Sequence, residues 1–99
     1  MIKVNVEKDK IEIIGHSDYG DLGKDIVCSA VSSIMITTIN AIYKMNLNSI
    51  EYIRDENNSM STIIIKKNDE VTLKLLENMV ELLKSLEKDY PKNIKVKES

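Results

Sequence analysis

The sequence predicts an α+β fold in which two helices pack on a mostly antiparallel sheet. Short runs with an apolar residue at every second position, the period of a β-strand, occur at the start of the chain. Two longer apolar stretches have the 3.6-residue spacing of helices instead. Turn-forming polar residues separate these segments and set the order ββαββαβ. At 99 residues, the chain is expected to form a single domain, residues 1–99.

The first two predicted strands form a hairpin. Ile2, Val4 and Val6 alternate with polar residues, as expected of a strand with one buried face. Residues 8–10 are a short polar break, and residues 11–14 resume as the second strand.

The first helix is expected over residues 24–44. Val27, Val31 and Ile34 recur at helical spacing, and no Gly or Pro interrupts the segment after residue 24. The segment is apolar nearly all round, which predicts a helix that is covered on more than one side. We find no apolar run that approaches the roughly 20 residues needed to span a bilayer.

The next two strands are expected at residues 50–54 and 60–67, joined by the turn-rich residues 55–58. Residues 63–65 are three isoleucines in a row. A continuous apolar run of this kind predicts a central strand that is buried on both faces.

A second, amphipathic helix follows, and its N-cap is expected to be Asn68 or Asp69. Pro91 ends the helix, and residues 94–97 are expected to add an edge strand. The apolar residues of the helix form one broad stripe: Leu73, Leu75, Leu76, Met79, Val80, Leu82, Leu83 and Leu86.

Composition excludes several classes of function. The formal net charge of −2 gives no general attraction to nucleic acid, so no direct nucleic-acid binding is expected. A single cysteine cannot form an intramolecular disulfide, and the N-terminal residues lack the apolar block of a signal peptide. We therefore expect a cytoplasmic protein without a membrane segment. A chain this small also gains stability by pairing, which makes a homodimer plausible.

Chemistry-bearing residues concentrate in residues 15–28, which hold the only histidine, the only cysteine and all three glycines. A thiol, an imidazole and a Gly- and Asp-rich loop are the parts of a nucleophilic site. Cys28 is expected in the first turn or so of the first helix, where free N–H groups favour a thiolate and stabilise an oxyanion. His16 is then its general base.

Three kinds of neighbour support this pair, and each has a second interpretation. Asp25 either orients the imidazole of His16 or only caps the helix. Ser32 shares the helical face of the cysteine and serves either substrate hydrogen bonding or packing. Gly20 and Gly23 allow the loop to hinge over a substrate, or simply connect two elements.

Two other interpretations of the same residues stay open. Cys28 alone is compatible with a small buried hydrophobic residue. A metal site built from His16, Asp18, Asp21 and Asp25 matches no known spacing, so no metal and no organic cofactor is expected.

Residues 15–33, GHSDYGDLGKDIVCSAVSS, resemble the signature of the ribosomal-processing cysteine proteases, called Prp. In that family a Gly-His opens a flexible loop and an Asp-Ile-Val-Cys follows. The separation between His16 and Cys28, 28 − 16 = 12 residues, is also similar to the family's. Chain length and the ββαββαβ order extend the resemblance over the whole chain.

The resemblance implies an endopeptidase that removes a short N-terminal extension from a large-subunit ribosomal protein through a thioester acyl-enzyme. It implies that Cys28 is the nucleophile and His16 the base, with Asp25 and Ser32 on the family's recurrent acidic and small polar positions. It further implies a homodimer, and an extension that ends in a short hydrophobic segment containing Phe.

Two rival functions remain at this point. In one, the chain is a non-enzymatic ribosome-associated or regulatory binding module with Cys28 in the core. In the other, it is a different cysteine-dependent hydrolase or a redox sensor, although no second cysteine is present to resolve an oxidised thiol within the chain.

Overall fold

A computed structural model describes residues 1–15 and 22–99, with side chains for residues 1–15 and 26–99. Its elements follow the predicted order ββαββαβ. They are β1 (Ile2–Val6), β2 (Lys10–Ile14), α1 (Leu22–Met45), β3 (Ile50–Asp55), β4 (Met60–Ile65), α2 (Glu70–Asp89) and β5 (Ile94–Glu98). The α+β fold class is confirmed.

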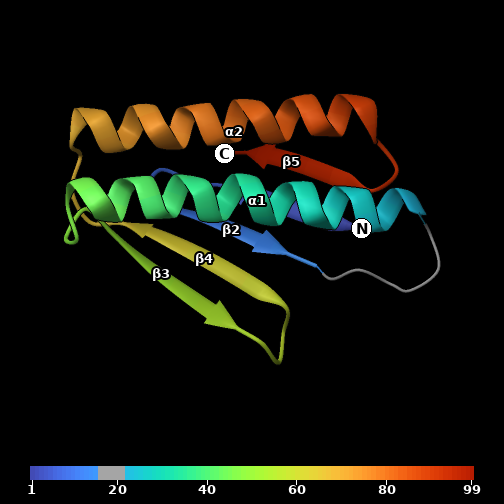
Figure 1. Cartoon of the computed structure of the whole chain (residues 1–99), viewed down its shortest axis with the longest axis horizontal. Helices are drawn as coiled ribbons and strands as arrows, with labels where there is room; N and C mark the ends of the chain where they lie inside the picture. The colour runs from blue at the N-terminus through green and yellow to red at the C-terminus, as the bar shows by residue number, and fades with distance from the viewer. Residues whose placement is uncertain (16–21) are drawn as a thin grey trace.

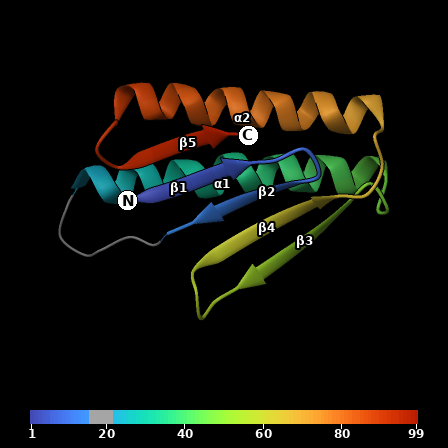
Figure 2. The same ribbon diagram turned by 180° about the vertical axis from the view of Figure 1, so that it is seen from behind.

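The sheet has the strand order β3-β4-β2-β1-β5. All neighbouring strands in it are antiparallel except β1 and β5, which run parallel. Helix α1 lies in front of the sheet in Figure 1 and behind it in Figure 2, and α2 runs beside α1. The fold therefore has one layer of strands and one layer of helices.

The core lies between these two layers. On each inner strand only every second residue is buried, as in Val4 of β1, Ile13 of β2 and Ile63 of β4. These residues join one core cluster with the inward faces of α1 and α2. The buried face of α1 is a single row: Val27, Val31, Met35, Thr38, Ile39 and Ile42.

The prediction that residues 63–65 form a central strand buried on both faces is wrong. Strand β4 is second from the edge, and only Ile63 is fully buried, while Ile64 is half-buried. In the described part of the chain, α1 and α2 cover the same face of the sheet, so Ile64 lies on the face that they leave open. A local apolar run does not reveal how many layers a fold has.

The statement that no apolar run approaches the length needed to span a bilayer also needs correction. Residues Ile26–Met45 of α1 are long and apolar enough, by length and composition alone, to cross a membrane. In the structure 33% of that window is buried, and its inward row packs on the sheet and α2. The core helix of a soluble protein meets the same criterion, but Ile26, Ile36 and Met45 are exposed, so packing within the described chain accounts for only part of the apolar composition of α1.

Helix α2 begins where the sequence predicts, and Asp69 rather than Asn68 is its N-cap. One carboxylate oxygen of Asp69 accepts from the backbone N–H of Val71 at 3.4 Å, and the other accepts from Thr72 Oγ1 at 2.9 Å. The predicted apolar stripe is too broad, because Leu73 and Leu82 are exposed. The fully buried residues form a narrower row, and Leu75 and Leu86 are partly buried beside it: Thr72, Leu76, Met79, Val80 and Leu83.

Candidate active site

A groove of about 450 Å³ runs between α1 and the helix-facing side of the sheet. One wall consists of α1 residues on successive turns, and the floor consists of side chains from β1 to β4. Its described lining residues are Ile2, Ile13, Gly15, Cys28, Val31, Ser32, Met35, Ile36, Tyr52, Arg54, Glu56 and Ser61.

Cys28 and Ser32 lie together on the α1 wall of this groove, one helical turn apart. Cys28 is half-buried: it packs against the core cluster and also lines the groove. Ser32 is exposed. A thiol in this position can be reached from the groove while the helix holds it in a fixed place.

The expectation that Cys28 lies in the first turn of its helix is wrong. Helix α1 begins at Leu22, so Cys28 is its seventh residue, about 9 Å along the axis at 1.5 Å per residue. Only the first four N–H groups of a helix lack an intrahelical partner. The N–H of Cys28 belongs to the helix interior, so the predicted oxyanion donors at the helix start are not beside the sulfur.

Gly15 brings the end of β2 to the same groove. Its φ is +133°, and a Cβ built on it would lie 2.8 Å from the carbonyl oxygen of Met1 and 3.0 Å from Ile2 Cα. Its N–H donates to the carbonyl oxygen of Ser59 at 3.0 Å. The residue immediately before His16 is thus fixed at the groove by a backbone approach that only glycine permits.

The remaining predicted site residues are only partly within the described chain. His16 and Gly20 lie outside the described residues, as do Asp18 and Asp21 of the metal alternative. Asp25 belongs to α1, but only its backbone is described.

Gly23 also lies in the helix, as its second residue, so its assignment to a hinging loop is wrong. The segment was predicted to be a loop because it is rich in glycine, but α1 starts two residues earlier than the apolar pattern indicates.

A polar cluster on β3 and β4 was missed by the sequence reasoning. Arg54 Nη1 donates to Ser61 Oγ at 3.0 Å, and Tyr52 Oη lies 3.1 Å from the same oxygen. Ser61 is 1% exposed although it carries a hydroxyl. A signal was available: Tyr52 and Arg54 fall on the same period-two phase as the buried Ile50, which places polar groups on the core-facing side of a strand.

The hairpin tip after β3 carries the charged rim of the groove. Arg54 Nε lies 3.4 Å from Glu56 Oε1, and the Glu56 side chain is 81% exposed. Hydrogen bonds from the Asn58 side chain, at 2.7 Å, and its backbone N–H, at 3.2 Å, hold the pKa of Asp55 below its ordinary value. These bonds hold the hairpin tip in place. Ser59, the residue after Asn58, accepts the hydrogen bond from the N–H of Gly15 through its carbonyl oxygen.

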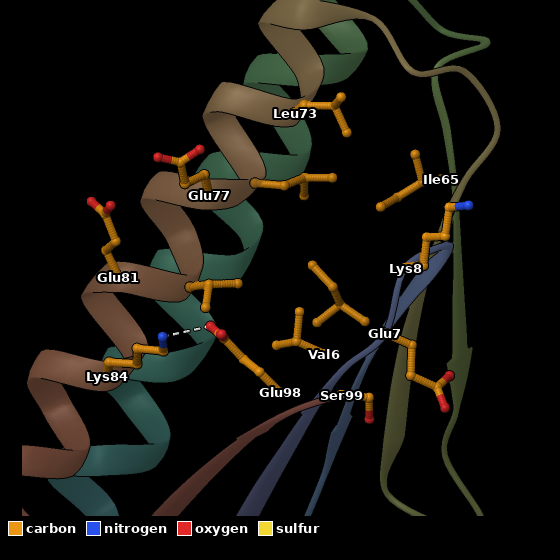
Figure 3. Close-up of a pocket in the computed structure, with 13 residues that line it drawn as sticks. Val6, Glu7, Lys8, Ile65, Leu73, Glu77, Glu81, Lys84, Glu98 and Ser99 are labelled. Carbon is orange, nitrogen blue, oxygen red and sulfur yellow. Dashed lines mark ion pairs between the residues drawn. The ribbon is translucent and has the colours of Figure 1, made fainter.

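A second hollow of about 370 Å³ lies between α2 and the far ends of the strands (Figure 3). Lys84 and Glu98 form an ion pair of 2.6 Å at its rim. Among the described residues, this hollow and the groove have no lining residue in common. The thiol therefore belongs to the groove alone. Among the side chains that the structure describes, those of residues 1–15 and 26–99, no group of three His, Cys, Asp or Glu is arranged to hold a metal ion.

Comparison with known proteins connects this arrangement to a protease family. The family model described as cysteine protease Prp matches residues 1–95. The ribosomal processing cysteine protease Prp of Staphylococcus aureus is 32% identical over 99 residues, covering 96% of this chain and 92% of the relative. The Prp of Mycoplasma genitalium is 28% identical over 100 residues, covering 99% of this chain and 96% of the relative.

Solved structures give the same result for the fold. The structure of S. aureus Prp with a covalently linked product peptide superposes with a TM-score of 0.83 at 28% identity, over 100% of both chains. The structure of S. aureus Prp with a substrate peptide superposes with a TM-score of 0.90 at 24% identity, again over 100% of both chains. The resemblance that residues 15–33 predicted is confirmed, and the chain belongs to the Prp family of cysteine proteases.

Proposed function

We propose that this protease removes a short N-terminal extension from a large-subunit ribosomal protein, with Cys28 as its nucleophile. The observation that carries the proposal is the position of Cys28, half-buried on the wall of a groove large enough for a peptide segment. The S. aureus relative, named a ribosomal processing protease, has been solved with a product peptide linked covalently to it. A sulfur open to the groove is the group that such a linkage requires.

The proposed reaction has two steps. His16 takes the proton of the Cys28 thiol, and the sulfur attacks the carbonyl carbon of the scissile bond. The C–N bond breaks, His16 returns the proton to the leaving amine, and a thioester remains. A water molecule, deprotonated by His16, then hydrolyses the thioester and releases the acid and the free thiol. Asp25 orients the imidazole or caps the helix.

The path of the backbone supports the pairing of base and nucleophile. Gly15 lines the groove that Cys28 lines, and His16 is the next residue along the chain. A base two residues beyond the end of β2 and a nucleophile on α1 can therefore approach one groove from different parts of the chain. The N–H of Gly15, bonded to Ser59, ties the entry of that segment to the β3–β4 hairpin.

The groove also suits the proposed substrate. Its sides on α1, β1 and β2 carry five apolar side chains, whereas the side on β3 and β4 is polar: the apolar residues are Ile2, Ile13, Val31, Met35 and Ile36. Burial of apolar side chains stabilises a complex by about 25 cal/mol for each Å² of apolar surface removed from water. A hydrophobic extension, as the family resemblance implies, is therefore a better ligand for these walls than a charged one.

We further propose that the enzyme is a cytoplasmic homodimer that binds its protein substrate without contacting nucleic acid. Ile26 of α1 supports pairing, because it is apolar, is exposed by 44% and does not line the groove. The net charge of −2 argues against general attraction to RNA. Light scattering and sedimentation of the purified protein would measure the mass of the particle.

The test of the proposed function is cleavage of an extended ribosomal protein, followed by intact-mass spectrometry. We expect one N-terminal fragment to be lost with the wild-type enzyme and none with Cys28→Ala, Cys28→Ser or His16→Ala. Ser29→Ala is a matched control, because Ser29 is the exposed neighbour of Cys28 on α1. We expect this variant to cleave the substrate at the wild-type rate. Full activity of Cys28→Ala would refute the assignment.

A further inference from the structure

We propose that Arg54 binds the substrate, by donating hydrogen bonds from its guanidinium to a main-chain carbonyl oxygen of the peptide in the groove. This inference rests on the proposed function, since it assumes that the peptide occupies the groove of Cys28. Arg54 lies across from α1, on the β3 side of the groove. It would position the peptide and take no part in bond breaking.

The Arg54 side chain is held in place by buried partners. Its Nη1 donates to Ser61 Oγ at 3.0 Å, and this hydroxyl, 1% exposed, is bonded in turn to Tyr52 Oη at 3.1 Å. The Arg54 side chain itself is 37% exposed. A guanidinium that is anchored at Nη1 by a buried hydroxyl and at Nε by an exposed carboxylate loses little conformational entropy when it binds a further acceptor.

Hydrogen-bond capacity remains on this guanidinium. An arginine side chain has five N–H donors. Among the described residues, Arg54 makes one bond to Ser61 and one, of 3.4 Å, to the exposed Glu56. By that count three donors have no partner within the described chain, and the groove is the space that they share with Cys28.

The open edge of β3 provides main-chain N–H and C=O groups beside Arg54 that an extended peptide could also bind. β3 is the outermost strand beside β4, and the N–H of Tyr52 points away from β4, because it donates to Tyr43 Oη at 3.0 Å. Residues two apart in a strand direct their N–H and C=O groups the same way. The main chain of Arg54 therefore also faces the open edge, whereas Tyr43 of α1 closes the edge at Tyr52.

The chemistry of the groove selects the kind of acceptor. The groove is mainly apolar on the side of α1, β1 and β2 and polar on the side of β3 and β4, where the charges of Arg54 and Glu56 offset each other. An acidic side chain in the substrate would have to displace Glu56 or be repelled by it. A neutral carbonyl oxygen of an extended apolar peptide meets the remaining N–H donors without that repulsion. We therefore infer a main-chain contact, which orients the peptide independently of the side chain at that position.

The first experiment measures kcat and KM for Arg54→Met, Arg54→Lys and the control Lys66→Met on one extended ribosomal peptide. Lys66→Met removes the same charge from a side chain that pairs with Glu51 at 3.0 Å and does not line the groove. We expect Arg54→Met to lower kcat/KM about tenfold or more, mainly through KM, as for loss of a charged hydrogen bond. We expect a smaller loss for Arg54→Lys and no change for Lys66→Met.

The second experiment separates a direct contact from a structural effect. Single thioamides, which are weaker acceptors, replace the peptide bonds on each side of the scissile bond in turn. We expect one position at which the thioamide slows the wild-type enzyme but does not further slow Arg54→Met. Equal kcat/KM for Arg54→Met and Lys66→Met, or equal thioamide losses in both enzymes at every position, would overturn the inference while leaving the proposed function intact. A wild-type enzyme that cleaves no extended ribosomal peptide would overturn both.

Discussion

Replacement of Gly15 by alanine tests the close backbone approach at the end of β2, directly before the proposed base His16. The added Cβ would lie 2.8 Å from the Met1 carbonyl oxygen and 3.0 Å from Ile2 Cα, and both are backbone atoms. Ile2 cannot move away easily, because it is 5% exposed and is paired with Ile94 of β5. The overlap must therefore be relieved by moving Gly15 itself, and with it the entry to residue 16.

The magnitude follows from two contributions. Alanine at the observed φ of +133° costs about 1–3 kcal/mol of conformational strain, and the backbone overlap adds about 1 kcal/mol more. We expect Gly15→Ala to lower the free energy of unfolding by about 2–4 kcal/mol, a large share of the ~5–15 kcal/mol typical of a domain. Activity should fall further than stability alone explains, because residue 16 is displaced.

Urea unfolding gives the change in stability, and kcat/KM at a temperature where the variant is folded gives the change in activity. Gly23→Ala is the matched control, since Gly23 lies in the helix and alanine favours helix by up to about 1 kcal/mol. The close approach of Gly15 to β1 would be refuted if Gly15→Ala lowered the free energy of unfolding by less than about 0.5 kcal/mol and kept full activity.

Three further predictions concern the scaffold. Asp69→Ala should lower the free energy of unfolding by about 1–2 kcal/mol, because the N-cap of α2 is lost. Asp69→Asn should keep most of the wild-type stability, since asparagine also caps helices. Equal decreases in melting temperature for the two variants would argue against the cap. Because the folded-state pKa of Asp55 is lowered, its contribution to stability is present above the ordinary pKa of an aspartate and is lost as the pH falls through the folded value. Stability of wild type minus that of Asp55→Asn, measured by urea unfolding from pH 7 to pH 3, should therefore shrink on acidification; a constant difference would contradict this. Ile63→Ala should cost about 2–5 kcal/mol and Ile64→Ala about 1 kcal/mol or less, and similar losses would show that the sheet is covered on both faces.

Local patterns predicted local structure well. The alternation of Ile2, Val4 and Val6 gave the first strand, and the polar residues before the second helix gave its cap at Asp69. The same patterns failed where the answer depends on long-range packing. Ile64 is as apolar as Ile63, and only the placement of both helices on one face of the sheet distinguishes them.

The candidate site shows the same limit. Scarcity and spacing singled out Cys28, His16 and the glycines, because a thiol and an imidazole are rare in this chain. Arg54 was missed, since it lies 26 residues beyond Cys28 (54 − 28 = 26) and reaches the groove only through the pairing of β3 with β4. Non-local strand pairing is not encoded in any short window of sequence.

The position of Cys28 six residues inside α1 changes how the site must work. A sulfur at a helix start would draw on free N–H groups, but in the second turn those groups are already bonded within the helix. In the proposed mechanism, activation of the thiol must therefore come from side chains rather than from free N–H groups, which makes it depend more on the imidazole of His16. What the helix supplies instead is rigidity, because a nucleophile anchored to the core beside Val27 and Val31 has few positions to occupy. The proposed base, His16, directly follows Gly15, whose close approach to Met1 and Ile2 tolerates no side chain. Two independently fixed walls can then define one reacting geometry although only 12 residues separate the two groups (28 − 16 = 12).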